Sequence, residues 1–203
     1  MTPGISKATD PGESMDSPAI PDDAALVRRC LAGDEAGVRA LVERFQGMVF
    51  GICFRMLGQR EDAEDVAQEV LVRIIRSLGR WDPSRPLKPW LLTITANRCR
   101  TFLEKRSRQP ACSEFASQLA VEETGSHSHD LAGELQLALE KLRADYRTCF
   151  VLFYQQQLSC LEIGEIVGCP QGTVKTWLHR ARRELAEHLQ RRGVVPDVHY
   201  ELR

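Results

Sequence analysis

Residues 161–178 read LEIGEIVGCPQGTVKTWL, and this stretch decides how the C-terminal part of the chain folds. Apolar residues recur at helical spacing over 161–167. Gly168 follows, and glycine can adopt the left-handed conformation that a sharp turn between helices needs. Pro170 and Gln171 restart the chain in a second helix. The pattern therefore predicts a helix–turn–helix. One face of its second helix is apolar and consists of Val174, Leu178, Ala181 and Leu185.

The second helix of this motif, expected over 171–190, is basic away from its apolar face. Residues 171–192 contain six basic and two acidic residues, so their net charge is +4. Such a helix fits the major groove of DNA, because it can pack on its partner helix while its outer side meets base edges and phosphates. The alternative is a solvated basic helix with no ligand.

The rest of the chain also shows helical periodicity, and no segment alternates with period two for long enough to indicate a sheet. Asp22 and Asp34 can cap the first two helices, and Gly33 and Gly58 can end them. Pro89 suits the first turn of the fourth helix. We therefore predict an all-α fold with eight helices, four in the first half of the chain and four in the second. The expected ranges are 22–31, 34–58, 61–78, 90–106, 134–142, 146–157, 158–167 and 171–190.

These helices fall into two small domains, 22–108 and 134–192. Residues 1–21 are rich in Pro, Gly, Ser and Asp, and we expect a disordered leader there. Residues 109–133 hold acidic residues and neither Lys nor Arg, which predicts a flexible acidic linker. Residues 193–203 are expected to be a C-terminal tail.

The overall composition favours a cytoplasmic protein. The 203 residues are 43% hydrophobic with a net charge of −1, and no run approaches the ~18 to 20 apolar residues of a membrane span. The N-terminus lacks a secretory-signal pattern. The seven cysteines include no C-x-x-C pair, so we expect neither a metal nor a cofactor. Buried free thiols are one interpretation and redox sensing is another. His127 and His129 are either solvated linker residues or metal ligands.

Two further surfaces stand out in the first domain. On the third helix, Asp62, Asp65 and Glu69 share one side opposite the apolar stripe, although an acidic face can also be merely solvated. On the fourth helix, five basic residues after position 97 face one glutamate, for a net charge of +4. The loop between Trp81 and Trp90 is rich in proline. Aromatic and polar groups of this kind can capture unpaired bases.

Three motifs, in this order, resemble the sigma-70 family of bacterial transcription initiation factors. Residues 62–70 (DAEDVAQEV) resemble region 2.2, and 90–98 (WLLTITANR) resemble region 2.3 running into 2.4. Residues 172–182 (GTVKTWLHRAR) resemble region 4, which reads the −35 promoter element. The short chain, with these two regions and a linker, is similar to the extracytoplasmic-function group.

The resemblance implies a role for each surface. The acidic face would dock on the β′ coiled coil of core RNA polymerase, through Asp62, Asp65, Gln68 and Glu69. Loop 82–88 and Asn97 would hold a flipped base of the −10 strand. The full set of expected −10 contacts is Ser84, Arg85, Lys88, Asn97, Arg98, Arg100 and Arg106. The expected −35 contacts are Thr173, Lys175, Thr176, His179, Arg180 and Arg183.

The resemblance also implies partners. These are core polymerase, through its β′ coiled coil and β flap, promoter DNA and an anti-sigma factor, with a monomeric free protein. Some side chains have a second interpretation. Trp90 can pack in the core, and Asn97 can be a local cap. Trp177 stands where many relatives carry a basic residue, and it either removes a phosphate contact or adds stacking and packing.

Two other classes of protein agree less well with the sequence. A helical sensor joined to a response-regulator type of helix–turn–helix explains the second domain, and it predicts dimeric binding to a palindrome without polymerase. It does not explain the acidic face and basic helix of the first domain. An enzyme is not expected, because the sequence has no paired histidines at metal spacing, no Gly-rich phosphate loop and no nucleophile elbow.

Overall fold

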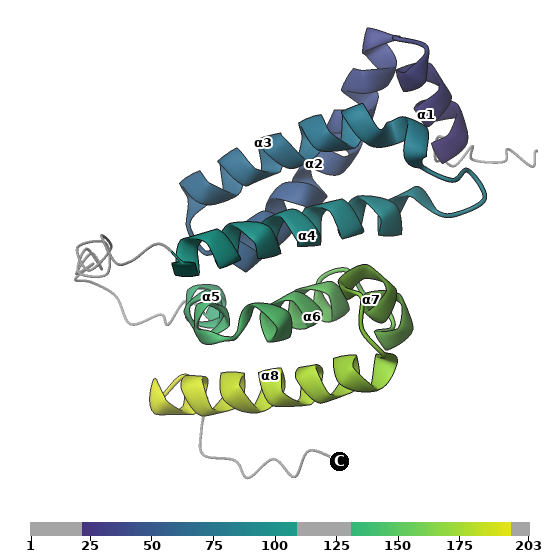
Figure 1. Ribbon diagram of the computed structural model, residues 1–203. Helices are drawn as coiled ribbons and strands as arrows, with labels where there is room; N and C mark the ends of the chain where they lie inside the picture. The colour runs from purple at the N-terminus through teal and green to yellow at the C-terminus, as the bar shows by residue number, and fades with distance from the viewer. Residues whose placement is uncertain (1–21, 109–130, 196–203) are drawn as a thin grey trace, which may run out of the picture.

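The computed structural model describes residues 22–108 and 131–195, and within these ranges the regular structure is entirely helical (Figure 1). The expectations for residues 1–21, for 109–130 and for 196–203 lie outside the described residues. The helices are α1 (Asp23–Leu31), α2 (Glu35–Leu57), α3 (Arg60–Ser77), α4 (Leu87–Arg108), α5 (Leu131–Lys141), α6 (Ala144–Tyr154), α7 (Cys160–Val167) and α8 (Gln171–Arg191), and a 3₁₀ turn (Leu78–Arg80) follows α3. The all-α prediction is confirmed.

The first unit, α1 to α4, begins and ends its helices largely where the local signals predict. Asp22 and Asp34 accept hydrogen bonds from the backbone at the starts of α1 and α2, and Gly58 ends α2 with a φ of 85°. The fourth helix was expected from Trp90, and it begins earlier, at Leu87. The Leu87 side chain is fully buried, and proline is tolerated in a first turn because its missing N–H has no helical acceptor there.

The second unit, α5 to α8, contains the predicted helix–turn–helix. Gly168 has a φ of 74°, in the left-handed region, and joins α7 to α8. The predicted apolar face of α8 is buried. The start of α7 was expected at Leu158, but Ser159 caps it. Ser159 and Glu162 form a capping box, in which each side chain bonds the backbone of the other residue.

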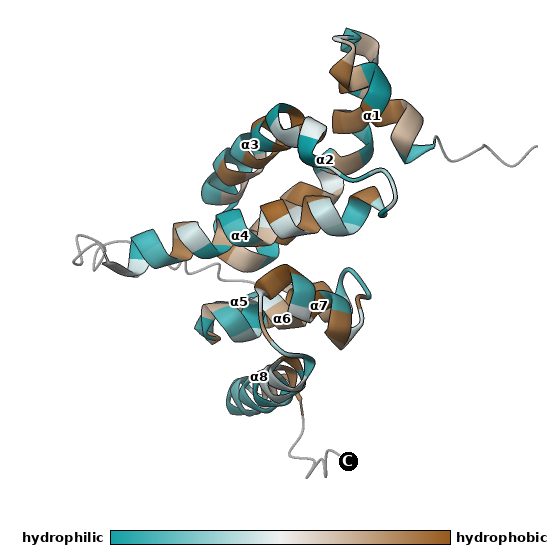
Figure 2. Ribbon diagram, turned by 45° about the vertical axis from the view of Figure 1, so that its right-hand side comes forward, coloured by the Kyte–Doolittle hydropathy of each residue, from teal (hydrophilic) through white to brown (hydrophobic). Residues whose placement is uncertain are grey.

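The two units pack against each other. Figure 1 shows α4 running across α6 and α7, while α8 lies on the far side of the second unit. One apolar cluster continues from the first unit into the second, and it includes Leu91, Cys99, Cys149, Leu152 and Ile163. The side of α8 turned away from this cluster is hydrophilic (Figure 2). None of the helices in the described ranges has the length and apolar character needed to cross a lipid bilayer.

The close approach of α7 to the following turn gives a stability test. A Cβ atom at Gly164 would lie 2.7 Å from the backbone oxygen of Cys169, so Gly164→Val forces the turn to move. We expect this variant to lose about 1–3 kcal/mol of unfolding free energy, measured by urea denaturation. Gly172→Val is the matched control, because a Cβ at Gly172 meets nothing within 4 Å. Equal stability of the two variants would contradict the tight turn.

Candidate nucleic-acid interface

The outer side of α8 brings the predicted −35 residues together on one helix. Thr173 is half-buried at its start, and the other predicted residues are exposed along it. These are Lys175, Thr176, His179, Arg180 and Arg183. The Thr176 hydroxyl donates to the carbonyl of Gly172 at 3.0 Å, and Arg183 lies 3.5 Å from Glu187. The face is therefore basic and open to solvent, as a helix in a major groove requires.

Tyr146 of α6 holds two residues of this helix in place. The Arg180 guanidinium donates to the Tyr146 hydroxyl at 3.0 Å, and this hydrogen bond raises the pKa of Arg180. The Trp177 ring packs at a tilt against the Tyr146 ring, with centroids 6.4 Å apart. Trp177 is half-buried and contacts both apolar clusters of the protein. Its role in the free protein is therefore packing between α6 and α8.

The acidic face of α3 presents Asp65, Gln68 and Glu69 to solvent, while Asp62 is half-buried. Two of these carboxylates pair with α4. Arg98 donates to Glu69 at 2.6 Å, and Arg106 donates to Asp62 at 3.1 Å. The predicted polymerase-facing surface and the predicted DNA-facing surface are thus adjacent and joined by ion pairs, which the sequence did not predict.

A groove runs beside this face. It is lined by the exposed Asp65, Gln68 and Glu69 and by four arginines, Arg73, Arg76, Arg80 and Arg98. The groove carries both signs of charge, two carboxylates and four guanidinium groups, so it suits a protein surface that also carries both signs better than a uniform polyanion.

The loop before α4 is held by a local turn. The Asp82 carboxylate accepts hydrogen bonds from the backbone N–H of Ser84 at 2.9 Å and from its hydroxyl at 2.8 Å. These bonds lower the pKa of Asp82. Arg85 and Lys88 are exposed beside the turn. Arg85 of the loop and Lys88 in the first turn of α4 therefore present two cations next to a fixed turn.

The two tryptophans that flank this loop contribute to the core. Trp81 is buried and Trp90 packs half-buried against the same apolar cluster. The core interpretation of Trp90 is therefore correct. Both rings also line a groove that opens between the loop and α7.

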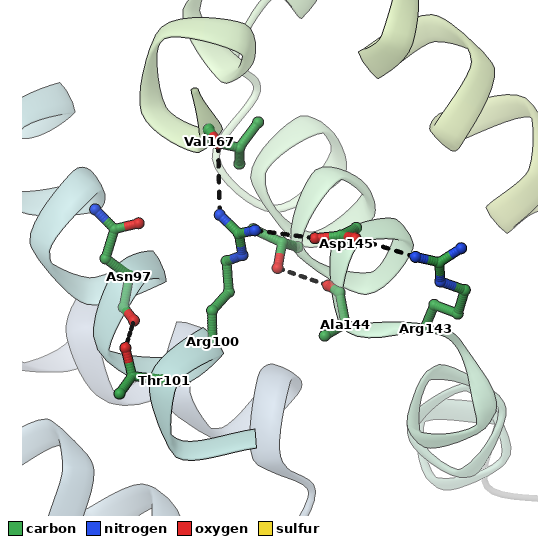
Figure 3. A network of polar contacts seen from close by, with 8 residues as sticks. Asn97, Arg100, Thr101, Arg143, Ala144, Asp145 and Val167 are labelled. Atoms are coloured by element: carbon green, nitrogen blue, oxygen red, sulfur yellow. Dashed lines mark hydrogen bonds and ion pairs between the residues drawn. The ribbon is translucent and has the colours of Figure 1, made fainter. Parts of the chain in front are cut away.

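On α4 itself, Asn97 and Arg100 differ in their surroundings. Asn97 is exposed in the middle of the helix, so it does not cap a helix end. Its backbone oxygen accepts a hydrogen bond from Thr101 at 2.9 Å. Arg100 instead reaches the second unit, where it donates to Asp145 at 3.1 Å and to the Val167 carbonyl at 3.4 Å (Figure 3).

Three residues of the second unit escaped the sequence reasoning, although two carried a signal. Tyr146 is buried, and a buried phenol usually needs a partner for its hydroxyl. Arg147 is only 6% exposed, and an arginine amid an apolar helical pattern indicates a buried polar network. Asp145 had no such signal, because its partner Arg100 lies on another helix, in the other unit.

The cysteines in the described ranges are free thiols. Cys53 and Cys99 are fully buried with sulfur atoms 3.7 Å apart, and contact with Cys53 together with burial raises the pKa of Cys99 strongly. Burial raises the pKa of Cys149 to about 12. A protonated, buried thiol reacts slowly with oxidants, so Cys99 and Cys149 support the interpretation as core residues, and Cys53 packs beside Cys99 in the same core. His127 and His129 lie outside the described residues.

Comparison with known proteins assigns the family. A family model described as Sigma-70 region 2 matches residues 41–109, and one described as Sigma-70, region 4 matches residues 132–185. The chain is 31% identical over 179 residues to the ECF RNA polymerase sigma factor SigW of Bacillus subtilis, a match that covers 81% of this chain and 95% of SigW. It is 30% identical over 181 residues to the ECF RNA polymerase sigma-E factor of Haemophilus influenzae, covering 83% and 95% of the two chains.

Solved structures show the same fold. The sigma factor RpoE of Bartonella quintana, solved with the anti-sigma factor NepR, has a TM-score of 0.60 and 25% identity, with 75% of this chain and 96% of that chain covered. CnrH, solved with the cytosolic domain of CnrY, has a TM-score of 0.61 at 24% identity, covering 83% and 97%.

The region 2 match excludes a sensor domain fused to a response-regulator type of helix–turn–helix. The family consists of regulatory initiation factors and not of known enzymes. The chain belongs to the sigma-70 family, in its extracytoplasmic-function group, and is a sigma factor that directs promoter-specific initiation of transcription.

Proposed function

We propose that this sigma factor divides its work among three surfaces: α3 for core RNA polymerase, α4 with its preceding loop for the −10 element, and α8 for the −35 element. The observation that supports this most directly is the pairing of buried and open faces on α8. Its apolar residues are in the core while its basic residues are exposed.

The proposed polymerase surface centres on Asp65 and Gln68. Both are exposed on α3, and among the four predicted residues Asp62 and Glu69 are already paired with arginines of α4. A carboxylate that remains open to solvent can meet a basic partner without first breaking an ion pair. We assign the β′ coiled coil to this face and the β flap to the second unit.

The proposed −10 surface combines the fixed loop with the exposed Asn97. Exposed polar groups beside aromatic rings are suited to an unpaired base, which has both a stacking face and a hydrogen-bonding edge. Ser84, Arg85, Lys88 and Asn97 supply the polar groups. The arginines on α4, namely Arg98, Arg100 and Arg106, would contact the sugar–phosphate backbone of the DNA.

We further propose that an anti-sigma factor regulates this protein, which is otherwise a cytoplasmic monomer. The support is that the two structures of similar fold were solved with NepR, an anti-sigma factor, and with the cytosolic domain of CnrY.

The first test concerns the polymerase surface. Asp65→Lys should weaken binding to core polymerase about tenfold or more, or about 1.4 kcal/mol, because it places a cation where a basic partner docks. Glu69→Lys is harder to interpret than Asp65→Lys, because the new lysine would also repel Arg98 of α4. The measurement is fluorescence titration of labelled protein with core enzyme. Glu43→Lys, an exposed carboxylate on α2, makes the same charge change and should bind normally. Equal affinity of the two variants would contradict the assignment.

The second test concerns −35 recognition. Arg180→Ala should lose about 1–3 kcal/mol of discrimination between the preferred −35 sequence and a mismatch. Lys175→Ala should weaken binding to all sequences alike. It should also reduce the slope of log affinity against log salt concentration by about 1. Promoter binding at several salt concentrations measures both. Tyr146→Phe, which frees the Arg180 guanidinium without removing it, should keep most of the discrimination. If Arg180→Ala instead lost the same affinity for every −35 sequence, Arg180 would be reassigned to a phosphate contact.

The third test separates strand opening from duplex binding. Asn97→Ala should leave −35 duplex binding intact and impair opening of the −10 region, because Asn97 is exposed on α4, the helix that we assign to the −10 strand. Permanganate footprinting on duplex and premelted templates measures the opening step. Thr101→Ala is the control, since the Thr101 hydroxyl is already bonded to the Asn97 carbonyl. Normal opening of the duplex by Asn97→Ala would show that the base is held elsewhere.

A further inference from the structure

The groove beside the acidic face of α3 changes its charge along its length. Its volume is about 730 Å³. The carboxylates of Asp65 and Glu69 line it in the first half of α3, and the guanidinium groups of Arg73 and Arg76 line it toward the end of that helix. Arg80, in the 3₁₀ turn that follows, extends the basic end. The groove is therefore acidic at one end and basic at the other.

The basic end holds cations that the fold itself does not pair. At the acidic end, Glu69 forms an ion pair with Arg98 of α4. Arg73, Arg76 and Arg80 are exposed, and among the residues that the structure describes none of the three has an ion-pair partner. The helix dipole favours a basic residue in the last turn, which accounts for Arg76 but not for Arg73, one turn earlier. The basic end can therefore meet an acidic ligand without first breaking an ion pair.

An exposed valine lies between the two charged ends. Val72 of α3 is 47% exposed and lines the same groove. Valine is a weaker helix former than the straight-chain residues, so an exposed valine in a helix contributes little to the fold. An interface between proteins typically has an apolar centre and a polar rim, and arginine is enriched in it. A DNA strand would instead meet like charge at the acidic end. The groove therefore fits a protein partner.

We propose that the arginines at the end of α3 are a second half of the polymerase surface and fix the direction in which the partner lies. The proposal rests on the proposed role of Asp65. Asp65 and Arg76 lie on the same helix, about 16 Å apart along its axis. The matching element of core polymerase is then about three helical turns long. It carries a basic group opposite Asp65, an apolar group opposite Val72 and an acidic group opposite Arg76. In the reverse direction like charges would meet at both ends.

Charge reversal in the full-length chain tests the basic half. Arg73→Glu and Arg76→Glu should each weaken binding to core polymerase about tenfold, because a carboxylate would then face the acidic group of the partner. Fluorescence titration of labelled protein with core enzyme measures this affinity. Arg39→Glu is the matched control, since Arg39 is exposed on α2, lies outside the groove and undergoes the same charge change. It should bind normally, and equal weakening by this control would overturn the proposal.

Two further variants test the centre of the groove and its direction. Val72→Ala should weaken core binding several-fold, because it removes apolar surface. Alanine is the better helix former, so this loss would not come from a loosened helix. The swapped variant, Asp65→Lys with Arg76→Glu, keeps the wild-type net charge and reverses the polarity of the groove. It should bind core more weakly than either single variant, and tighter binding than both would overturn the fixed direction.

The outcomes separate this proposal from the proposed function. If Asp65→Lys weakens core binding while both arginine reversals bind normally, the basic half is wrong and the role of Asp65 stands. If the arginine reversals weaken binding and Asp65→Lys does not, the role of Asp65 fails, and the fixed direction fails with it. Promoter binding by the holoenzyme, assembled at saturating core enzyme, covers the remaining case. Normal core affinity with weaker promoter binding in the arginine reversals would assign these arginines to DNA and overturn the proposal.

Discussion

The continuous apolar cluster between the two halves of the molecule is the constraint on which the other contacts depend. Leu91 of α4 and Ile163 of α7 are fully buried, and both belong to this cluster. Small helical units bury little surface on their own, so packing two of them together increases the apolar area removed from water. The resulting close approach of α4 to α6 and α7 is what brings Arg100 within reach of Asp145.

Features set by neighbouring residues were predictable from the sequence. The left-handed turn at Gly168, the cap at Asp34 and the apolar face of α8 each depend on a few consecutive residues, and each was found as expected. The exposed basic side of α8 was predictable for the same reason, since a single helix carries all of it. The start of α4 was placed too late, because Leu87 joins the helix to bury its side chain in a core that no local pattern describes.

Features that need two distant segments were not predictable in this way. Arg98 and Glu69 are 29 residues apart, and Arg106 and Asp62 are 44 apart. Periodicity shows that each residue lies on a polar face, but it does not show which polar faces meet. The buried network around Arg147 has the same origin, because its acceptors belong to two distant parts of the chain, the end of α2 and the end of α5.

The ion pairs between α3 and α4 have a thermodynamic consequence. A protein that draws Glu69 away from Arg98 leaves an uncompensated cation on α4, which raises the affinity of that helix for a polyanion. Linkage is reciprocal, so a polyanion that takes Arg98 raises the affinity of α3 for a basic protein by the same factor. Two ligands that never touch each other would thus bind with positive cooperativity through a pair of side chains whose atoms lie 2.6 Å apart.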